Sequence, residues 1–444
     1  MLATQNDAAM MQELQQRLVD ARRRTDEIFS LVKPDALYER PIPERHRIIF
    51  YIGHLEAFDW NLLGERVFGL KSFHPEFDRL FAFGIDPVGG GLPDDQPSAW
   101  PPVRQVHEYA AKIRQILDES LGRGISESSL PEFSLATLLN VAAEHRLMHA
   151  ETLAYMLHQL PLEKKILRAT ENLSAPPIEP RMIDIPAGPT TLGQRRSDEK
   201  FGWDNEFEAV TVDVPAFAID QYKVTNRQYL DCVLAGGYDT PALWSDDDWK
   251  WRSAHNISHP VFWKRDGDQW RYRGMFADVP LPMNAPVYVS HAEAKAYARW
   301  AGKHLPTEAE WHRAAYGSED GTGRPHPSLY PWGDAEPGPR FGNFDFARWD
   351  PTPVNAFPDG NSAFGVGDLM GNGWEWTSTP FAPFPGFEPF PFYRGYSADF
   401  FDGKHFVMKG GSARTAACML RRSFRNWFQS HYQYAYAGFR CVQR

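Results

Sequence analysis

Two histidines lie four residues apart in the stretch EHRLMHAETL, which covers residues 144–153. If this stretch is helical, His145 and His149 project from one face, and Leu138 and Met156 lie on that face too. Both imidazoles then point toward the expected core. Burying neutral imidazoles without partners is costly, so each ring needs a hydrogen bond or a metal ion. Because a chain with 15 histidines often contains such a pair by chance, the pair alone leaves both interpretations open.

A third histidine favours the metal. His54 lies in the stretch YIGHLEAF, where Phe50, His54 and Phe58 repeat at helical spacing. Three inward histidines from two helices can occupy one face of an octahedron and leave positions open for a substrate and O2. That arrangement suits a catalytic Fe(II) or Zn(II) ion rather than a closed structural site. We predict a metal site formed by His54, His145 and His149, whose neutral imidazoles accept either metal.

Other polar residues near these histidines are expected to have different roles. Glu151 lies about 200° around the helix from His149, so it should support the fold or the ligands rather than bind the metal. The histidines without a comparable context are expected at the surface or in loops, and these are His46, His74, His158, His291 and His304.

Four amphipathic segments are expected to position the three histidines. Each carries apolar residues at spacings of three and four, as helices in a bundle do. An antiparallel four-helix bundle can hold a metal ion in its interior. We therefore expect a helical metal-binding bundle over residues 1–160 and a linker over 161–182. The four segments are 10–32, 45–69, 102–122 and 134–160.

The remaining chain, 183–444, has a different character, with short β-like runs interrupted by Gly, Pro and Asn. Two helices are predicted there, over 290–303 and 307–317, because each segment starts with a capping box. We expect little other regular structure in this domain, and an α+β fold for the whole chain. The segment 380–396 is rich in Pro and Phe and is predicted to be an ordered loop, since disordered segments avoid aromatic residues.

The composition excludes several classes of protein. The net charge of −10 argues against nucleic acid or an anionic membrane as a partner, because neither offers counterion release to an acidic surface. The three cysteines are far apart and form no C-x-x-C pair, which argues against a disulfide scaffold and a thiolate zinc site. No apolar run is long enough for a signal peptide or a membrane span. We predict a cytoplasmic protein that acts on small molecules.

Several motifs resemble those of one enzyme family. His54 together with HRLMHAE resembles the iron motif of the DinB-like domain in ergothioneine-type sulfoxide synthases. FGWDNE (201–206) and SFRNW (423–427) are similar to signatures of the second domain of these enzymes. That domain has the formylglycine-generating-enzyme fold, a C-type-lectin-like module, which five further motifs resemble: LPTEAEW (305–311), YPWGD (330–334), DLMGNGWEWT (368–377), VMKGGSA (407–413) and AGFRC (437–441).

The resemblance implies an activity and a cofactor. In this family a non-heme Fe(II) ion, held by three histidines, uses O2 as a co-substrate. The enzyme joins a sulfur or selenium donor to imidazole C2 of hercynine, which is Nα-trimethylated histidine. By this resemblance His54, His145 and His149 are expected to hold Fe(II).

The resemblance also implies which residues of the second domain act on the substrates. Asn426, with Trp427 beside it in the same motif, is expected to bind the amino-acid end of hercynine. A tyrosine of the 380–396 loop is expected to deliver a proton or hydrogen atom to the oxygen. Tyr393 is preferred for this role over Tyr396.

Two positions depart from the family pattern near the expected hercynine pocket. The usual Asp after RNW is Phe428 here, which could face the trimethylammonium group through a cation–π interaction rather than a charge. The usual Gln before the second motif histidine is Met148. The pocket around Phe428 and Met148 is therefore expected to differ in construction from that of the family.

A third departure concerns the donor. The segment 70–101 is predicted to be a functional loop, and the part GIDPVGGGLPDD (84–95) lacks the arginines that pair with the donor carboxylates in enzymes using γ-glutamylcysteine. An anionic peptide would meet aspartates instead. A neutral, polyhydroxylated selenosugar fits better, which favours the selenoneine synthase branch.

Several alternatives remain open. The nearest is a sulfoxide synthase of the ergothioneine pathway that uses cysteine or another thiol. A zinc-dependent DinB-like thiol transferase would use the same histidines without O2. A lectin-like binding module without catalysis would need no redox metal. A formylglycine-generating enzyme is disfavoured, because Cys418 stands alone after the GGS motif.

Overall fold

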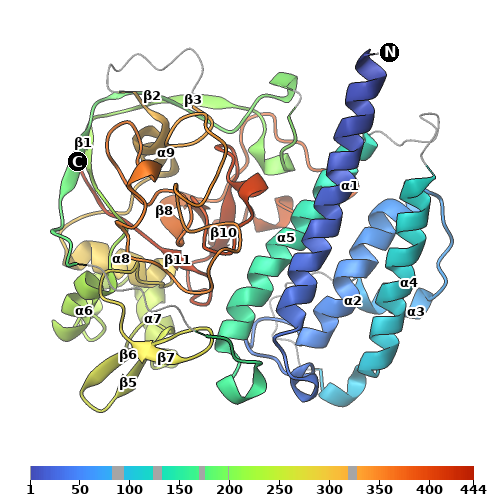
Figure 1. Ribbon diagram of the computed structural model, residues 1–444. Coiled ribbons are helices and arrows are strands. Elements are labelled where there is room, and N and C mark those ends of the chain that lie inside the picture. The colour runs from blue at the N-terminus through green and yellow to red at the C-terminus, as the bar shows by residue number, and fades with distance from the viewer. Residues whose placement is uncertain (1, 83–94, 124–132, 170–175, 199, 319–327) are drawn as a thin grey trace. The chain divides into compact units, whose positions relative to one another are not determined.

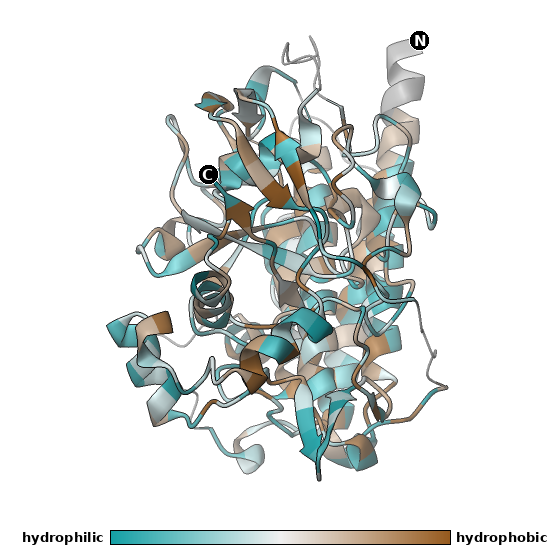
Figure 2. Cartoon of the chain, turned by 90° about the vertical axis from the view of Figure 1, so that its left-hand side faces the viewer, coloured by the Kyte–Doolittle hydropathy of each residue, from teal (hydrophilic) through white to brown (hydrophobic). Residues whose placement is uncertain are grey.

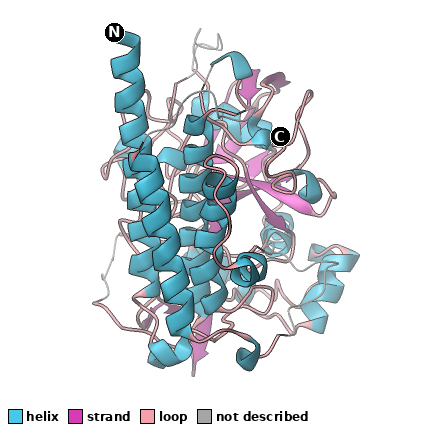
Figure 3. Ribbon diagram, turned by 90° about the vertical axis from the view of Figure 1, so that its right-hand side faces the viewer, coloured by secondary structure: helices cyan, strands magenta, loops and turns pink. Residues whose placement is uncertain are grey.

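The protein divides into two compact units, Met1–Arg168 and Ala169–Arg444. The division falls within the segment 161–182 that was expected to be a linker. The first unit is helical and the second combines short strands, helices and long loops, so the predicted α+β class is confirmed (Figures 1 and 3). The computed structural model describes residues 2–82, 95–123, 133–169, 176–198, 200–318 and 328–444.

The first unit is built from helices that the amphipathic segments predicted, with one addition. Helix α1 packs along α5, and α2 packs against both α3 and α4. Helix α3 lies in the segment that was predicted to be a loop, so that prediction was wrong for its seven residues. The bounds are α1 Leu2–Phe29, α2 Ile48–Asp59, α3 Pro75–Phe81, α4 Val103–Gly122 and α5 Leu135–Gln159.

Local sequence explains how the two helices with the predicted ligands begin and end. The side chain of Ser134 caps α5 by accepting a hydrogen bond from the Thr137 amide, and Pro161 follows the end of the helix. Helix α2 continues directly into a π-helical turn over Trp60–Glu65. In the middle of α2, Gly53 lets α3 approach closely, because a Cβ at this position would lie 2.5 Å from the Phe81 ring.

The described part of the second unit contains the two predicted helices and two that were not predicted. Helices α8 (His291–Trp300) and α9 (Glu308–Tyr316) begin with the expected capping boxes at Ser290 and Thr307. Helices α6 (Asn226–Leu234) and α7 (Asp246–Ala254) correct the expectation of little other regular structure.

The strands of the second unit are short. Among the described residues they form four small sheets, with the orders β1-β4-β12, β10-β9-β8-β11, β2-β3 and β5-β6-β7. In the four-stranded sheet β10 is antiparallel to β9, and β11 is parallel to β8. The bounds are β1 Met182–Ile185, β2 Gly188–Leu192, β3 Val210–Val214, β4 Phe217–Asp220, β5 Trp263–Asp266, β6 Gln269–Arg273, β7 Asp278–Pro280, β8 Trp374–Pro380, β9 His405–Lys409, β10 Asn426–Gln429, β11 Ala437–Gly438 and β12 Val442–Gln443.

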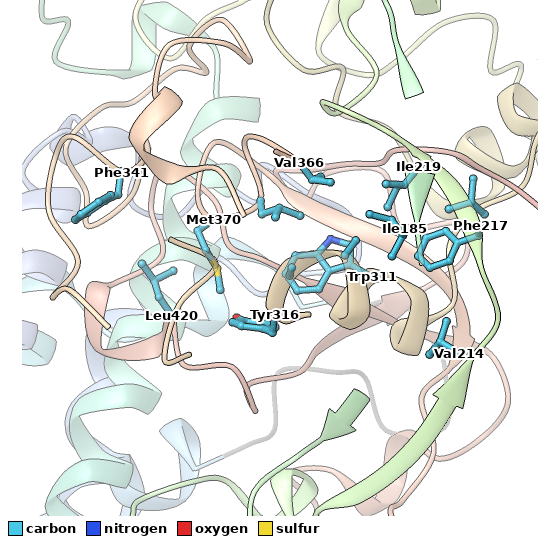
Figure 4. Packing of buried hydrophobic residues seen from close by; sticks show 14 of the residues in the cluster. Ile185, Val214, Phe217, Ile219, Trp311, Tyr316, Phe341, Val366, Met370 and Leu420 are labelled. Carbon is cyan, nitrogen blue, oxygen red and sulfur yellow. The ribbon is translucent and has the colours of Figure 1, made fainter. Parts of the chain in front are cut away.

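A hydrophobic core in the second unit surrounds Trp311 of α9, which is fully buried. Residues from β1, β3, β4 and later loops pack around this ring (Figure 4). They include Ile185, Val214, Phe217, Ile219, Met370 and Leu420. This packing fixes α9 and the strands on which the later loops rest.

Hydrophobic and hydrophilic residues are interleaved along the elements of both units (Figure 2). Over the described part of the chain, none of the helices combines the length and the apolar character needed to span a bilayer.

Candidate metal centre

The three predicted histidines come together in the first unit. One nitrogen from each of His54, His145 and His149 lies within 4.8 Å of the other two. His54 belongs to α2, and the other two belong to α5. The side chains are 5%, 2% and 2% exposed, so water does not satisfy their nitrogens. The group is a buried three-nitrogen site of the kind that a metal ion occupies.

The orientation of His54 is fixed by α3. Its Nδ1 donates a hydrogen bond of 2.7 Å to the backbone carbonyl of Phe81, at the end of α3. Among the described residues, its buried Nε2 has no hydrogen-bond partner. A hydrogen bond from one imidazole nitrogen to a carbonyl commonly fixes the tautomer in which the other nitrogen binds a metal. His54 therefore offers Nε2 as a ligand atom.

The two histidines of α5 direct their Nε2 atoms toward each other, at a separation of 3.2 Å. Metal–nitrogen bonds of about 2.0–2.1 Å place two ligands of one ion roughly 3 Å apart. The spacing therefore fits either a hydrogen bond between the rings or two ligands of a shared ion. With the unsatisfied Nε2 of His54 on the facing helix, the donor set fits a metal.

All three imidazoles are held in the neutral form. Burial lowers the pKa of His54 to about 4, although its bond to the Phe81 carbonyl acts in the opposite direction. Burial, followed by the neighbouring imidazoles, also lowers the pKa of His145 and His149 well below the usual value. Neutral imidazole is the form that binds metals, so at neutral pH the site presents lone pairs rather than protons.

Aromatic rings restrict the orientations of the ligands. The ring of Phe58 stacks on His145 with centroids 3.5 Å apart, and Phe50 stacks on His54 at 4.8 Å. Both phenylalanines lie on α2, in the stripe that predicted His54. The predicted stripe thus supplies the ligand His54 and the phenylalanine rings that stack on His54 and His145.

A buried network of charges lies next to the histidines and was not predicted. Arg146 contacts Glu56 with two hydrogen bonds of 2.9 Å and Asp59 with one of 2.6 Å. Arg114 of α4 adds bonds of 2.7 and 2.9 Å to Glu56. Burial alone would raise the pKa of Glu56, but the two guanidinium groups lower it to about 2. Two acidic residues within the apolar run of α2 were the sequence signal for this network.

Three predicted substrate residues share the short strand β10 of the second unit. The ring of Trp427 stacks on Phe381 with centroids 4.1 Å apart, and the ring of Phe428 stacks on Tyr432 at 4.7 Å. The side-chain oxygen of Asn426 accepts a hydrogen bond of 2.8 Å from the next backbone amide. All three side chains remain partly exposed.

The predicted tyrosines lie in an aromatic loop of the second unit. The Tyr396 ring stacks on the buried Trp203 with centroids 4.0 Å apart. The centroid of the Tyr393 ring lies 5.5 Å from that of Tyr396 and 6.4 Å from that of Trp203. Tyr396 is buried and Tyr393 is partly exposed. Asp204 also holds the loop, since its carboxylate accepts a hydrogen bond of 2.5 Å from the Ser397 hydroxyl.

The residues expected near the donor need a correction. Of the segment 84–95, residues 84–94 lie outside the described residues. The last, Asp95, does not carry a bare charge, because Arg47 bonds to it at 2.9 Å and Arg40 also pairs with it. In addition, the exposed Arg79 near the end of α3 places a guanidinium group shortly before this segment. The electrostatic argument against an anionic donor is weaker than predicted.

Three further residues singled out from the sequence lie on helices α5 and α8. Met148 precedes His149 on α5 and is partly exposed. Five histidines were predicted to lie at the surface or in loops, and this prediction was wrong for His158 and His291, which lie on helices and are 0% and 1% exposed.

Comparisons with known proteins cover nearly the whole chain. Residues 17–153 match the DinB superfamily, and residues 170–444 match the sulfatase-modifying factor enzyme 1-like domain. The chain is 34% identical to a protein named hercynine oxygenase from Mycolicibacterium thermoresistibile, over 96% of this chain and 94% of the relative. It is 37% identical to a hercynine oxygenase from Mycobacterium tuberculosis, over 76% and 77% of the two chains. Ergothioneine biosynthesis protein 1 of Neurospora crassa is 29% identical, over 93% of this chain and 55% of that protein.

Proposed function

The chain belongs to the hercynine oxygenase family, and from this premise we propose that it joins a chalcogen to imidazole C2 of hercynine with O2 as oxidant. The observation that carries the proposal is the convergence of three buried, neutral histidines in the first unit. In a balanced reaction, hercynine loses the hydrogen at C2 and the donor loses the hydrogen on sulfur or selenium. One oxygen atom of O2 ends on the chalcogen, and the other leaves as water with both hydrogens.

Fe(II) is the metal that this proposal requires. His54 would hold it through Nε2, together with His145 and His149. Bound Fe(II) would supply the activation of O2. The protein's part is to keep the three imidazoles neutral and oriented. Burial keeps them neutral, and the Phe81 carbonyl and the stacked phenylalanines orient them.

The residues of β10 would bind hercynine. The amide of Asn426 can donate a hydrogen bond to the hercynine carboxylate, since its oxygen is already engaged by the backbone. Trp427 would hold the strand in place through its stack on Phe381. The partly exposed ring of Phe428 can face the trimethylammonium group, a contact worth about 0.5–2 kcal/mol. Met148, which precedes His149 on α5, is also proposed to contact hercynine.

Tyr393 would deliver the proton or hydrogen atom. It is partly exposed, whereas Tyr396 is buried against Trp203, so Tyr396 is assigned a packing role. We expect Tyr393→Phe to divert turnover toward oxidised donor while O2 consumption continues. Product partition measured by mass spectrometry tests this, and an unchanged partition removes Tyr393 from the scheme.

The donor is proposed to be a selenosugar, which makes the enzyme a selenoneine synthase. The absence of arginine from the sequence of residues 84–95 supports a neutral donor. The exposed guanidinium group of Arg79, shortly before this segment, favours the second candidate, a thiol donor that carries a carboxylate, such as cysteine. The ergothioneine name of one relative points the same way.

One experiment separates these functions. The enzyme is loaded with Fe(II) under anaerobic conditions and given hercynine with a selenosugar, cysteine or γ-glutamylcysteine. Uptake of O2 and product mass are then followed. A carbon–selenium adduct formed only from the selenosugar supports the selenoneine assignment, and adducts formed only from a thiol assign the ergothioneine branch. Absence of O2 uptake with every donor would favour the zinc thiol transferase or the binding module.

A further inference from the structure

A single buried arginine links the two helices that carry the metal ligands. Arg146 follows His145 directly on α5, and its guanidinium group reaches four acceptor atoms on α2. These are both carboxylate oxygens of Glu56 at 2.9 Å, Asp59 Oδ2 at 2.6 Å and the Leu55 carbonyl at 3.1 Å. The residues Glu56, Asp59 and Arg146 are here called the charged clamp.

The charged clamp lies beside the ligands in both helices. On α2, Glu56 is two residues after His54, and on α5, Arg146 is one residue after His145 and three before His149. Because helices are rigid over such short distances, a fixed position of Arg146 against Glu56 fixes the rise and rotation of α5 relative to His54. A planar guanidinium with two carboxylates provides directional bonds, which apolar packing does not.

Stability alone does not account for the charged clamp. All three side chains are at most 1% exposed, and taking such charges out of water costs several kcal/mol per ion. Replacing a buried ion cluster by apolar side chains of similar volume is often neutral or stabilising. What the cluster provides that an apolar core cannot is one defined register between two helices, and here that register sets the distances between the three ligand nitrogens.

We propose that Arg146 is a positioning residue, which holds His145 and His149 at the distance from His54 that one metal ion requires. The inference rests on the proposed metal site, but not on the identity of the donor or on hercynine chemistry. Mutation of groups that orient metal ligands typically costs about 10- to 100-fold in metal affinity, and we expect a loss in this range when Arg146 is replaced.

The test measures metal binding without turnover. Co(II) is titrated anaerobically into the full chain, and its visible absorption reports both affinity and coordination geometry. Arg146→Met and Arg146→Lys should each lower the affinity by about 10- to 100-fold and change the spectrum. Lysine keeps the charge but lacks the planar, rigid fork of donors with which arginine pairs with carboxylates in a fixed geometry. Full affinity and an unchanged spectrum in the lysine variant would therefore overturn a role in positioning.

Arg114→Met is the matched control. Arg114 also bonds to Glu56 with its guanidinium group, yet it lies on α4, which carries no ligand. We expect its Co(II) affinity to stay within about threefold of the wild type, because the typical penalty applies to groups that orient ligands. An equal loss in Arg114→Met and Arg146→Met would overturn the proposal.

A variant without buried charge covers the case in which single substitutions prevent folding. The triple variant Glu56→Met, Asp59→Leu and Arg146→Met leaves no unpaired ion and should fold. It should still show the loss of Co(II) affinity and the changed spectrum. A folded triple variant with wild-type affinity and spectrum would refute the assignment, whereas failure of wild-type protein to bind Co(II) at all would refute the metal site itself.

Discussion

The two units hold their predicted functional residues by different means. In the first unit the three histidines project from long helices, and a backbone hydrogen bond and stacked phenylalanine rings orient their imidazoles. In the second unit the substrate residues lie on the four-residue strand β10 and on an aromatic loop, where stacked rings hold them. We therefore expect substitutions in the two units to have different effects. Loss of one ligand should abolish chemistry and leave the fold intact, whereas loss of one ring should unfold the surroundings.

The largest effect is expected from removal of a ligand. His149→Ala should lower metal affinity by more than about 100-fold, since removal of even a supporting residue typically costs 10- to 100-fold. O2 uptake should fall below detection, while the thermal unfolding of the metal-free protein changes little. Metal content by mass spectrometry and O2 electrode traces measure this. His304→Ala, at an exposed position, is the control and should behave as the wild type.

Removal of the Trp203 ring, on which the aromatic loop packs through Tyr396, should have the opposite effect. Trp203 is 0% exposed and stacks on Tyr396, and truncation of such a residue costs about 3–5 kcal/mol. Trp203→Ala should therefore destabilise the second unit and leave Co(II) affinity unchanged. Denaturant unfolding compares it with Trp300→Ala, whose side chain is 37% exposed. If Trp203→Ala lowered Co(II) affinity as much as His149→Ala does, the two units would not act independently.

The stability of the second unit should depend on pH through Asp204. Burial raises the pKa of Asp204 to about 6, although its bond to Ser397 acts in the opposite direction. Because the folded-state pKa lies above the unfolded value, the protonated form favours the folded state. This contribution is full below about pH 4, is lost as the pH rises through 6, and amounts to about 2–3 kcal/mol. Asp204→Asn should remove this slope from unfolding curves measured between pH 4 and 8, and an unchanged slope would exclude Asp204 as its source.

The smallest effect is expected where α3 meets α2. Gly53→Ala would place a Cβ 2.5 Å from the Phe81 ring, and overpacking of this kind costs about 1–3 kcal/mol. As Phe81 moves, its bond to His54 should lengthen and Co(II) affinity should fall a few-fold. Gly122→Ala is the control, since a Cβ there meets no atom within 4 Å. If the two variants give equal affinities and melting temperatures, α3 does not support His54.

The sequence predicted the first site better than the second for a physical reason. Helical periodicity places residues four apart on one face, so the spacing of His145 and His149 predicted that both face the core. The stripe from Phe50 to Phe58 predicted the same for His54. The same reasoning missed α3, whose seven residues are too few to show a period. It also missed the pairing of Arg146 with Glu56, because 90 residues separate the two along the chain.

Some signals in the second unit were present but not used. Thr225 with Gln228 forms a capping box at α6, and Ser245 followed by three aspartates is a favourable start for α7. The stack of Trp203 on Tyr396 joins residues far apart in sequence. No local pattern predicts such a contact, and the roles of Tyr393 and Asn426 came from the family resemblance alone.

The bond from His54 Nδ1 to the Phe81 carbonyl has a consequence for magnetic resonance. Its proton is buried and hydrogen-bonded, so it should exchange with solvent far more slowly than an exposed imidazole proton. Next to a paramagnetic ion, this proton would resonate far outside the usual spectral range and persist after transfer to D2O. Its resonance would therefore report in solution on changes in the contact between His54 and the end of α3, without any substitution in the chain.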